Sequence, residues 1–72
     1  MLTHRFNSTS IDEASYIPDQ SELILKFKPS GKRYSYQGVE SETYYALTRA
    51  PSAGQYFNQN IRGIYMSERI SQ

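Results

Sequence analysis

Residues 31–47, GKRYSYQGVESETYYAL, decide the fold of this chain, because the spacing of the apolar residues changes within them. Tyr34 and Tyr36 alternate with polar residues, a period of two that is typical of a strand with one buried face. Gly38 interrupts this alternation. From Glu40 to Ala50 the apolar residues follow helical spacing instead, and Pro51 ends the helix. The stretch therefore predicts a strand, a bend and an amphipathic helix.

The residues before this stretch predict further strands that pair with it. Glu22–Lys28 alternates clearly, and Pro29-Ser30-Gly31 predicts a hairpin that leads into the strand Lys32–Gln37. Ile11–Ile17 alternates less well, and we predict a strand there because a sheet of only two strands is marginally stable. Its pattern puts Ile11, Glu13, Ser15 and Ile17 on one face, and Asp12, Ala14 and Tyr16 on the other.

The residues after this stretch predict a second helix. Ser52 is a candidate N-cap with Gln55 three residues later, which is the spacing of a capping box. Phe57, Ile61 and Ile64 then form an apolar stripe at helical spacing. The chain ends show no clear period, so residues 1–7 are expected to be a mobile lead-in and residues 65–72 to fray.

These elements predict one α+β domain over residues 1–72, with its core in about residues 8–65. The expected architecture is a three-stranded antiparallel β-meander followed by two α-helices packed on one face. The side chains expected to face the helices are Leu23, Leu25, Phe27, Tyr34 and Tyr36.

Composition narrows the function classes. The chain has 72 residues, no Cys and a net charge of +1, so it has no disulfide, no thiolate nucleophile and no Cys-based metal site. No apolar run is long enough for a signal peptide or a membrane span. We therefore expect a soluble, cytoplasmic protein without a membrane partner.

The residue types needed for catalysis show no productive grouping. His4 is the only His, and it lies in the expected lead-in. The carboxylates form no pair in an apolar setting, and Ser8, Ser10 and Ser52 have no base beside them. The sequence therefore predicts no enzyme, no cofactor and no metal site.

Two groups of side chains on the predicted sheet are candidates for binding. Lys26, Lys28 and Arg33 are expected on the face away from the helices, where they could contact phosphates or form an ordinary solvated face. Tyr34 and Tyr36 could stack on bases, as aromatic pairs do in several RNA-binding folds, or belong to the core. Both interpretations stay open for each group.

Ser52–Arg62 is a third candidate. Gly54 allows close approach at the start of the second predicted helix, where free N–H groups can hold an anion. Asn58 and Arg62 lie four residues apart on one face of this helix. The alternative is that the segment is held by hydrogen bonds to Ser8 and Ser10.

The chain resembles the KTSC domain, a family found at the C-terminus of some lysyl-tRNA synthetases and as stand-alone bacterial and phage proteins. The resemblance runs from about Ser8 to Tyr65. Glu40 departs from the family pattern, which usually has Pro at this position. The matching residues are Ser8, Ser10, Ile11, Tyr16, Leu23, Leu25, Phe27, Gly31, Tyr34-Ser35-Tyr36, Val39, Tyr44, Leu47, Ala50, Ser52, Gly54, Tyr56-Phe57-Asn58, Ile61-Arg62 and Tyr65.

Three functions are compatible with these observations. The resemblance implies an RNA-binding role through its synthetase context, so the first hypothesis is a small non-catalytic module that binds RNA or another polyanion. The residues expected to carry it are Lys26, Lys28, Arg33, Tyr34, Tyr36, Asn58 and Arg62. The alternative is a protein-interaction module, such as a phage accessory protein that inhibits a host factor, acting through a sheet edge or the open sheet face. A third hypothesis is a pocket for a small anion. The oligomeric state stays open.

Overall fold

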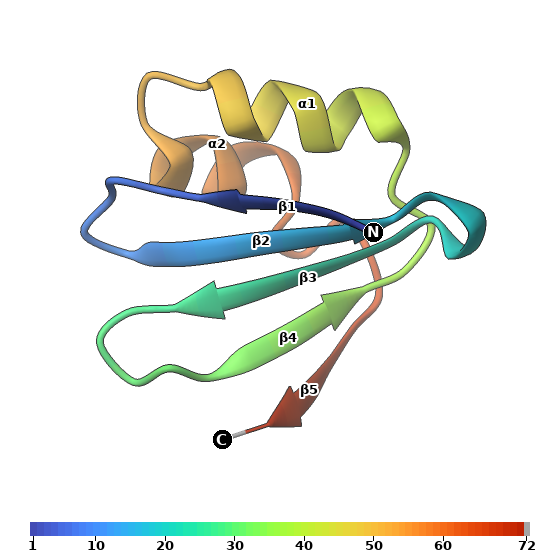
Figure 1. Cartoon of the computed structure of the whole chain (residues 1–72), viewed down its shortest axis with the longest axis horizontal. Helices are drawn as coiled ribbons and strands as arrows, with labels where there is room; N and C mark the ends of the chain where they lie inside the picture. Colours follow the sequence, from blue (N-terminus) through green and yellow to red (C-terminus); the bar gives the residue numbers. More distant parts are fainter. Residues whose placement is uncertain (72) are drawn as a thin grey trace.

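The structure, a computed structural model, describes residues 1–71, which form one five-stranded antiparallel sheet and two α-helices. The spatial order of the strands is the same as their order in the chain (Figure 1). The strands are β1 (Leu2–Arg5), β2 (Ile11–Ile17), β3 (Glu22–Phe27), β4 (Arg33–Tyr36) and β5 (Ser67–Ser71). A 3₁₀ turn, η1 (Pro18–Gln20), joins β2 to β3, and the helices are α1 (Ser41–Arg49) and α2 (Ala53–Asn60).

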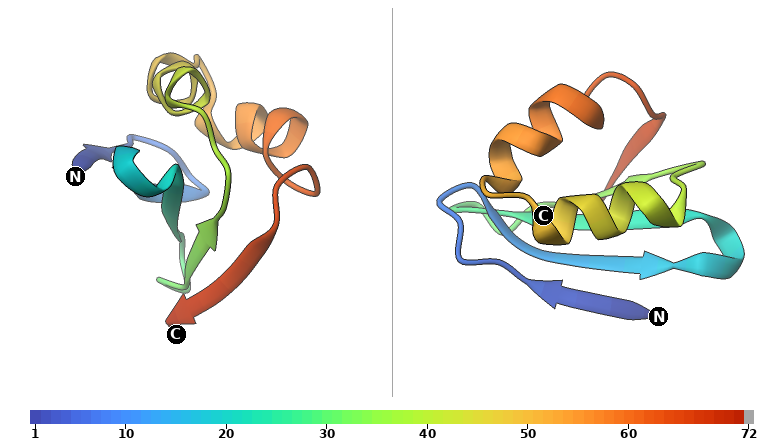
Figure 2. Two further views of the ribbon diagram at one scale, coloured as in Figure 1. Left: turned by 90° about the vertical axis from the view of Figure 1, so that its right-hand side faces the viewer. Right: turned by 90° about the horizontal axis from the view of Figure 1, so that it is seen from above.

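The α+β class and the packing of both helices on one sheet face are confirmed (Figure 2). The predicted number of strands is wrong, because the described residues contain five strands and not three. The expected lead-in contains β1, which pairs with β2 from Leu2↔Tyr16 to Arg5↔Glu13. The segment expected to fray contains β5, which pairs with β4, while Gln72 lies outside the described residues.

The predicted face of Ile11 is also wrong, because β2 contains a bulge. Ile11 pairs with Phe27 but Glu13 pairs with Lys26, so Asp12 is an extra residue in the ladder. An extra residue reverses the alternation of side chains on its N-terminal side. Ile11 therefore shares the buried face with Ala14 and Tyr16.

The core lies between the helices and the sheet. Leu23, Leu25 and Tyr36 are buried as predicted, while Phe27 and Tyr34 are partly buried and pack against the same cluster. Aromatic contacts join the layers. The Tyr16 ring stacks on Tyr44 of α1 at 5.1 Å between centroids, and the Phe57 ring of α2 meets Phe27 at 5.2 Å and Tyr36 at 5.8 Å.

The start of α2 is confirmed, and its apolar stripe is shorter than predicted. The Oγ atom of Ser52 accepts a hydrogen bond from the backbone N–H of Gln55 at 3.2 Å. Phe57 and Ile61 pack inward, but Ile64 is 62% exposed because α2 ends at Asn60. Neither helix of residues 1–71 is long and apolar enough to cross a membrane.

Candidate interaction face

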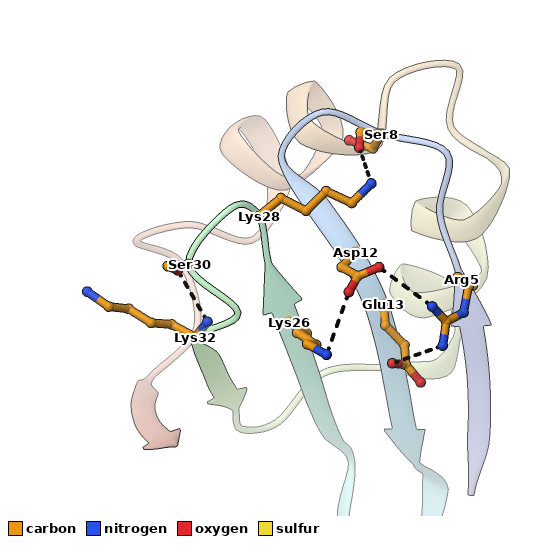
Figure 3. A network of polar contacts seen from close by, with 8 residues as sticks. All are labelled: Arg5, Ser8, Asp12, Glu13, Lys26, Lys28, Ser30 and Lys32. Carbon is orange, nitrogen blue, oxygen red and sulfur yellow. Dashed lines mark hydrogen bonds and ion pairs between the residues drawn. The ribbon is translucent and has the colours of Figure 1, made fainter. Parts of the chain in front are cut away.

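The face of the sheet turned away from α1 and α2, here called the outer face, carries two of the three predicted cations. Lys26 and Arg33 lie directly opposite each other on β3 and β4. Lys28 follows the end of β3, and its ammonium group donates a hydrogen bond to the backbone oxygen of Ser8 at 2.8 Å. Figure 3 shows Lys28 reaching toward Ser8 while Lys26 points toward Asp12. The structure therefore brings Lys26 and Arg33 together and directs Lys28 elsewhere.

Carboxylates are interleaved with these cations. Asp12 lies 3.7 Å from the Lys26 ammonium and 3.9 Å from the guanidinium of Arg5, which is also 4.0 Å from Glu13 (Figure 3). Such partly exposed pairs contribute only about 0–1 kcal/mol each to stability, but they offset one another's charge. Within residues 1–71, Arg33 has no carboxylate oxygen within 4.0 Å.

The outer face is hollowed at its centre. This cavity, here called the outer hollow, has a volume of about 260 Å³. Ile24 and Ser15 line it from the central strands, and Met1 and Ile70 line it from the two edges of the sheet. Met1 is 80% exposed and Ile70 is 47% exposed, so the apolar walls are open to solvent. Among the residues that the structure describes, the charged side chains that line the hollow are Glu13, Lys26 and Arg33.

The other end of the outer face is acidic and hydrogen-bonded. Ser35 is only 2% exposed, and its hydroxyl donates to Glu22 at 2.5 Å and accepts from the Gln37 amide at 2.6 Å. Glu68 of β5 lies opposite Ser35 in the ladder. The outer face thus runs from the basic pair Lys26 and Arg33 to the carboxylates of Glu22 and Glu68.

Tyr34 and Tyr36 lie on the opposite, helix-covered face and contribute to the core. Tyr36 is 5% exposed, and burial raises the pKa of its phenol to about 12, with Tyr34 adding to the shift and Arg62 opposing it. The Tyr34 ring contacts Phe27 edge-on at 5.8 Å. The core interpretation of this pair therefore has direct structural support, and the Tyr36 ring is covered by protein.

Asn58 and Arg62 come together at the end of α2, on the helix side of the sheet. The Arg62 guanidinium donates a long hydrogen bond of 3.4 Å to the Asn58 side-chain oxygen, and both residues are exposed. They share no surface with Lys26 and Arg33, because the sheet lies between the two groups. The predicted binding residues therefore divide between two sides of the molecule.

Ser10 lies against Gly54 at the start of α2, while the side-chain hydrogen bonds of Ser8 and Ser10 stay within their own segment. A Cβ atom at Gly54 would overlap the Ser10 hydroxyl, which would have to rotate away to make room for it. A hollow of about 160 Å³ lies beside this helix start, and the residues that line it include no cation. Its lining is Ala50, Pro51, Ser52, Gln55, Tyr56 and Gln59.

Metal-binding geometry is not found within residues 1–71, which contain no group of three or more His, Cys, Asp or Glu side chains placed to share an ion. His4 instead packs its ring against Phe6 at 4.6 Å between centroids.

The outer hollow was not predicted from the sequence, because two of its walls come from chain ends that show no strand pattern. The available signal was weak: Ile24 is an apolar residue on the polar side of an otherwise clear alternation. A single apolar residue on a protein surface is ordinary, so Ile24 could not have identified the hollow by itself.

The fold and the outer hollow define a small α+β domain with one helix-covered sheet face and one open sheet face. The profile of the KTSC domain matches residues 7–65, and the chain belongs to the KTSC domain family. Its structure is similar to the crystal structure of a KTSC domain protein from Yersinia pestis, with a TM-score of 0.90, 27% sequence identity and 97% of each chain covered. No curated protein matches the chain.

Proposed function

We propose that this chain is a non-catalytic protein-interaction module that binds its partner through the outer face. The observation that carries the proposal is the outer hollow, an apolar depression at the centre of an uncovered sheet face with charged groups around it. An apolar centre within a polar rim is the usual anatomy of a protein interface. The helices cover the opposite face, so the outer face is the larger free surface of the sheet.

The size of the outer face is compatible with this function. A stable interface buries about 800 Å² on each partner. That is roughly a sixth of the chain's accessible surface of 4617 Å². One face of a five-stranded sheet can supply such an area without rearrangement of the fold.

Polyanion binding has less support from the geometry. Phosphate backbones are held by several cations that converge on one surface. Here Lys26 lies beside Asp12, Lys28 is bonded to Ser8, and Arg62 is on the other side of the sheet. The charges of the outer face are mixed, which suits a protein surface better than a phosphate backbone.

Capture from a bacterial lysate, with and without nuclease, tests the proposal. The baits are the parent, two outer-face variants (Ile24→Asp and Ile70→Asp) and a helix-side control (Gln59→Asp), which adds the same charge at an exposed position of α2. We expect a nuclease-resistant protein to be retained by the parent and the control and lost by both outer-face variants. Thermal unfolding of each bait shows that it is folded, and Ile70→Asp is informative even if Ile24→Asp is unstable.

Two results would contradict the proposal. Retention of the same protein by both outer-face variants would place its binding site elsewhere. Material that disappears after nuclease treatment would instead support polyanion binding.

A further inference from the structure

We infer that the outer hollow receives one large apolar side chain from an acidic segment of the partner protein, and that a carboxylate of this segment pairs with Arg33. The inference rests on the proposed protein-interaction function and deepens it by stating the chemistry of the partner.

The size and walls of the hollow fit a single anchoring side chain. Pockets for drug-sized ligands have volumes of about 300–1,000 Å³. The outer hollow, at about 260 Å³, lies just below that range. Its apolar walls, Met1, Ile24 and Ile70, come from three different strands or their flanks and surround the same space. One apolar side chain buried in the hollow would exclude water from all three walls, as the central side chains of interface hot spots do.

The charge at the hollow determines which kind of residue is favoured beside the apolar anchor in the partner segment. One row of paired residues crosses β1, β2, β3 and β4 and consists of Arg5, Glu13, Lys26 and Arg33. The bulge residue Asp12 lies beside this row, so the group contains three cations and two carboxylates. The carboxylates are accounted for by Arg5 and Lys26, at 3.7 to 4.0 Å. The surplus positive charge is therefore centred on Arg33, which has no such partner among residues 1–71.

A guanidinium in this position favours a carboxylate over other groups. Arg binds carboxylates through two parallel hydrogen bonds, and this geometry is stronger when an apolar contact beside it excludes water. A basic segment would instead place like charges together next to Lys26 and Arg33, which disfavours it as a partner. Glu22 and Glu68 lie at the other end of the outer face, so the acidic residue of the partner is directed toward Arg33.

The register sets the spacing expected in the partner. Ile24 pairs with Ser35, and Lys26 pairs with Arg33, so Ile24 and Arg33 are diagonal neighbours on the outer face. Diagonal neighbours are about 7–8 Å apart, close to the distance spanned by two residues of an extended segment. The carboxylate should therefore stand within two positions of the apolar anchor.

Selection from a phage-displayed library of random peptides tests this chemistry on the whole chain. Met1 and Ile70 both line the hollow, so the affinity tag is joined to the C-terminus through a long flexible linker that keeps it away from this surface. The baits are the parent, Arg33→Glu and the control Arg49→Glu, which makes the same charge change at an exposed position at the end of α1. We expect the parent and the control to enrich peptides with a large apolar residue within two positions of Asp or Glu. Arg33→Glu should lose this preference and enrich Lys or Arg instead.

Fluorescence anisotropy then measures the affinity of the most strongly enriched acidic peptide. This peptide should bind Arg33→Glu at least tenfold more weakly than it binds the control Arg49→Glu. If Arg33→Glu does not fold, Arg33→Gln replaces it and should lose the acidic preference without gaining a basic one. The inference is overturned if no peptide is enriched, or if the acidic preference persists in the Arg33 variants.

The lysate experiment separates this failure from that of the proposed function. If lysate capture still depends on Ile24 and Ile70, the interaction function stands and only the partner chemistry is wrong. If lysate capture is independent of the outer face, the proposed function itself fails.

Discussion

At the scale of single residues, the absence of a Cβ atom at Gly54 lets Ser10 approach the start of α2 closely. Gly54 lies in the first turn of α2, where Ala would ordinarily be the better helix former by up to about 1 kcal/mol. An Ala Cβ atom here would overlap the Ser10 hydroxyl, so Ala requires Ser10 to change its side-chain position. The close approach therefore holds the start of β2 against the start of α2.

We expect Gly54→Ala to destabilise the domain by roughly 1 kcal/mol, because Ser10 must move away from its contact with Ser8. Ser10→Ala removes the overlapping atom, so the double variant Ser10→Ala/Gly54→Ala should be at least as stable as Ser10→Ala alone. Urea denaturation of the four proteins measures the coupling. Additive effects of the two substitutions would contradict the assigned contact.

The buried phenol of Tyr36 predicts a pH dependence of stability. Burial raises its folded-state pKa to about 12, whereas the exposed group in the unfolded chain titrates near 10.0. The unfolded state therefore loses this proton first, so the stability contributed by Tyr36 is complete below pH 10.0 and is lost as the pH rises toward 12.

The test is the free energy of unfolding of the parent and Tyr36→Phe between neutral pH and pH 12. Above pH 10.0 the stability of the parent should fall more steeply than that of the variant, by at most about 1.4 kcal/mol per pH unit. Equal slopes would show that the phenol is not protected by the fold.

At the scale of secondary structure elements, the helix starts differ in how they are capped. Ser52 caps α2 with its side chain, whereas Glu40, the N-cap residue of α1, makes no such hydrogen bond. α2 is a short helix of eight residues, so its first turn is a large part of it.

Ser52→Ala should therefore cost about 1 kcal/mol of stability, the usual effect of losing an N-cap. Ser41→Ala is the matched control, because Ser41 lies in the first turn of α1 but does not cap it. Its stability should stay within about 0.5 kcal/mol of the parent. If the two variants were equally stable in thermal and urea unfolding, the cap would have no energetic role.

The sequence allows the middle of the sheet and both helices to be predicted, because their apolar side chains are buried with a regular period. Leu23 and Leu25 alternate cleanly, and Tyr44 and Leu47 repeat at helical spacing. The edge strands could not be predicted in this way. β1 and β5 are held by backbone pairing with neighbours, and their side chains are mostly exposed, so burial leaves no periodic pattern in their sequence.

The same limitation applies to the candidate site. Lys26 and Arg33 could be placed on one face from the alternation of the two central strands, and the register confirms it. The positions of Asp12 and Ile70 could not be predicted, because Asp12 reaches Lys26 through a bulge and Ile70 reaches the outer hollow through β5. Neither a bulge nor an exposed edge strand has a distinct signature in this chain.

At the scale of the whole molecule, we expect the charged side chains of the outer face to affect what the domain binds and not whether it folds. The triple variant Lys26→Gln/Lys28→Gln/Arg33→Gln should remain folded, since the inward side chains are untouched and partly exposed ion pairs contribute at most about 1 kcal/mol each. We further expect the parent and the triple variant to show the same dependence of RNA affinity on salt.

Filter binding to mixed RNA at several salt concentrations provides the measurement. A slope of log affinity against log salt that is smaller in the triple variant by about 2–3 units would show that these cations release counterions on RNA binding. That outcome would favour polyanion binding over the proposed protein interaction.

The order of the strands also has a consequence for how the domain folds and opens. The pairings β1–β2, β2–β3 and β3–β4 each join neighbours in the chain, whereas β4–β5 encloses both helices. Closing that long loop carries the largest entropic cost, so β5 should dock last during folding and detach first in native-state fluctuations. Hydrogen exchange should therefore be fastest at the amides of β5 that bond to β4. Since Ile70 forms one wall of the outer hollow, each detachment opens the hollow, and a bound partner should slow exchange along β5.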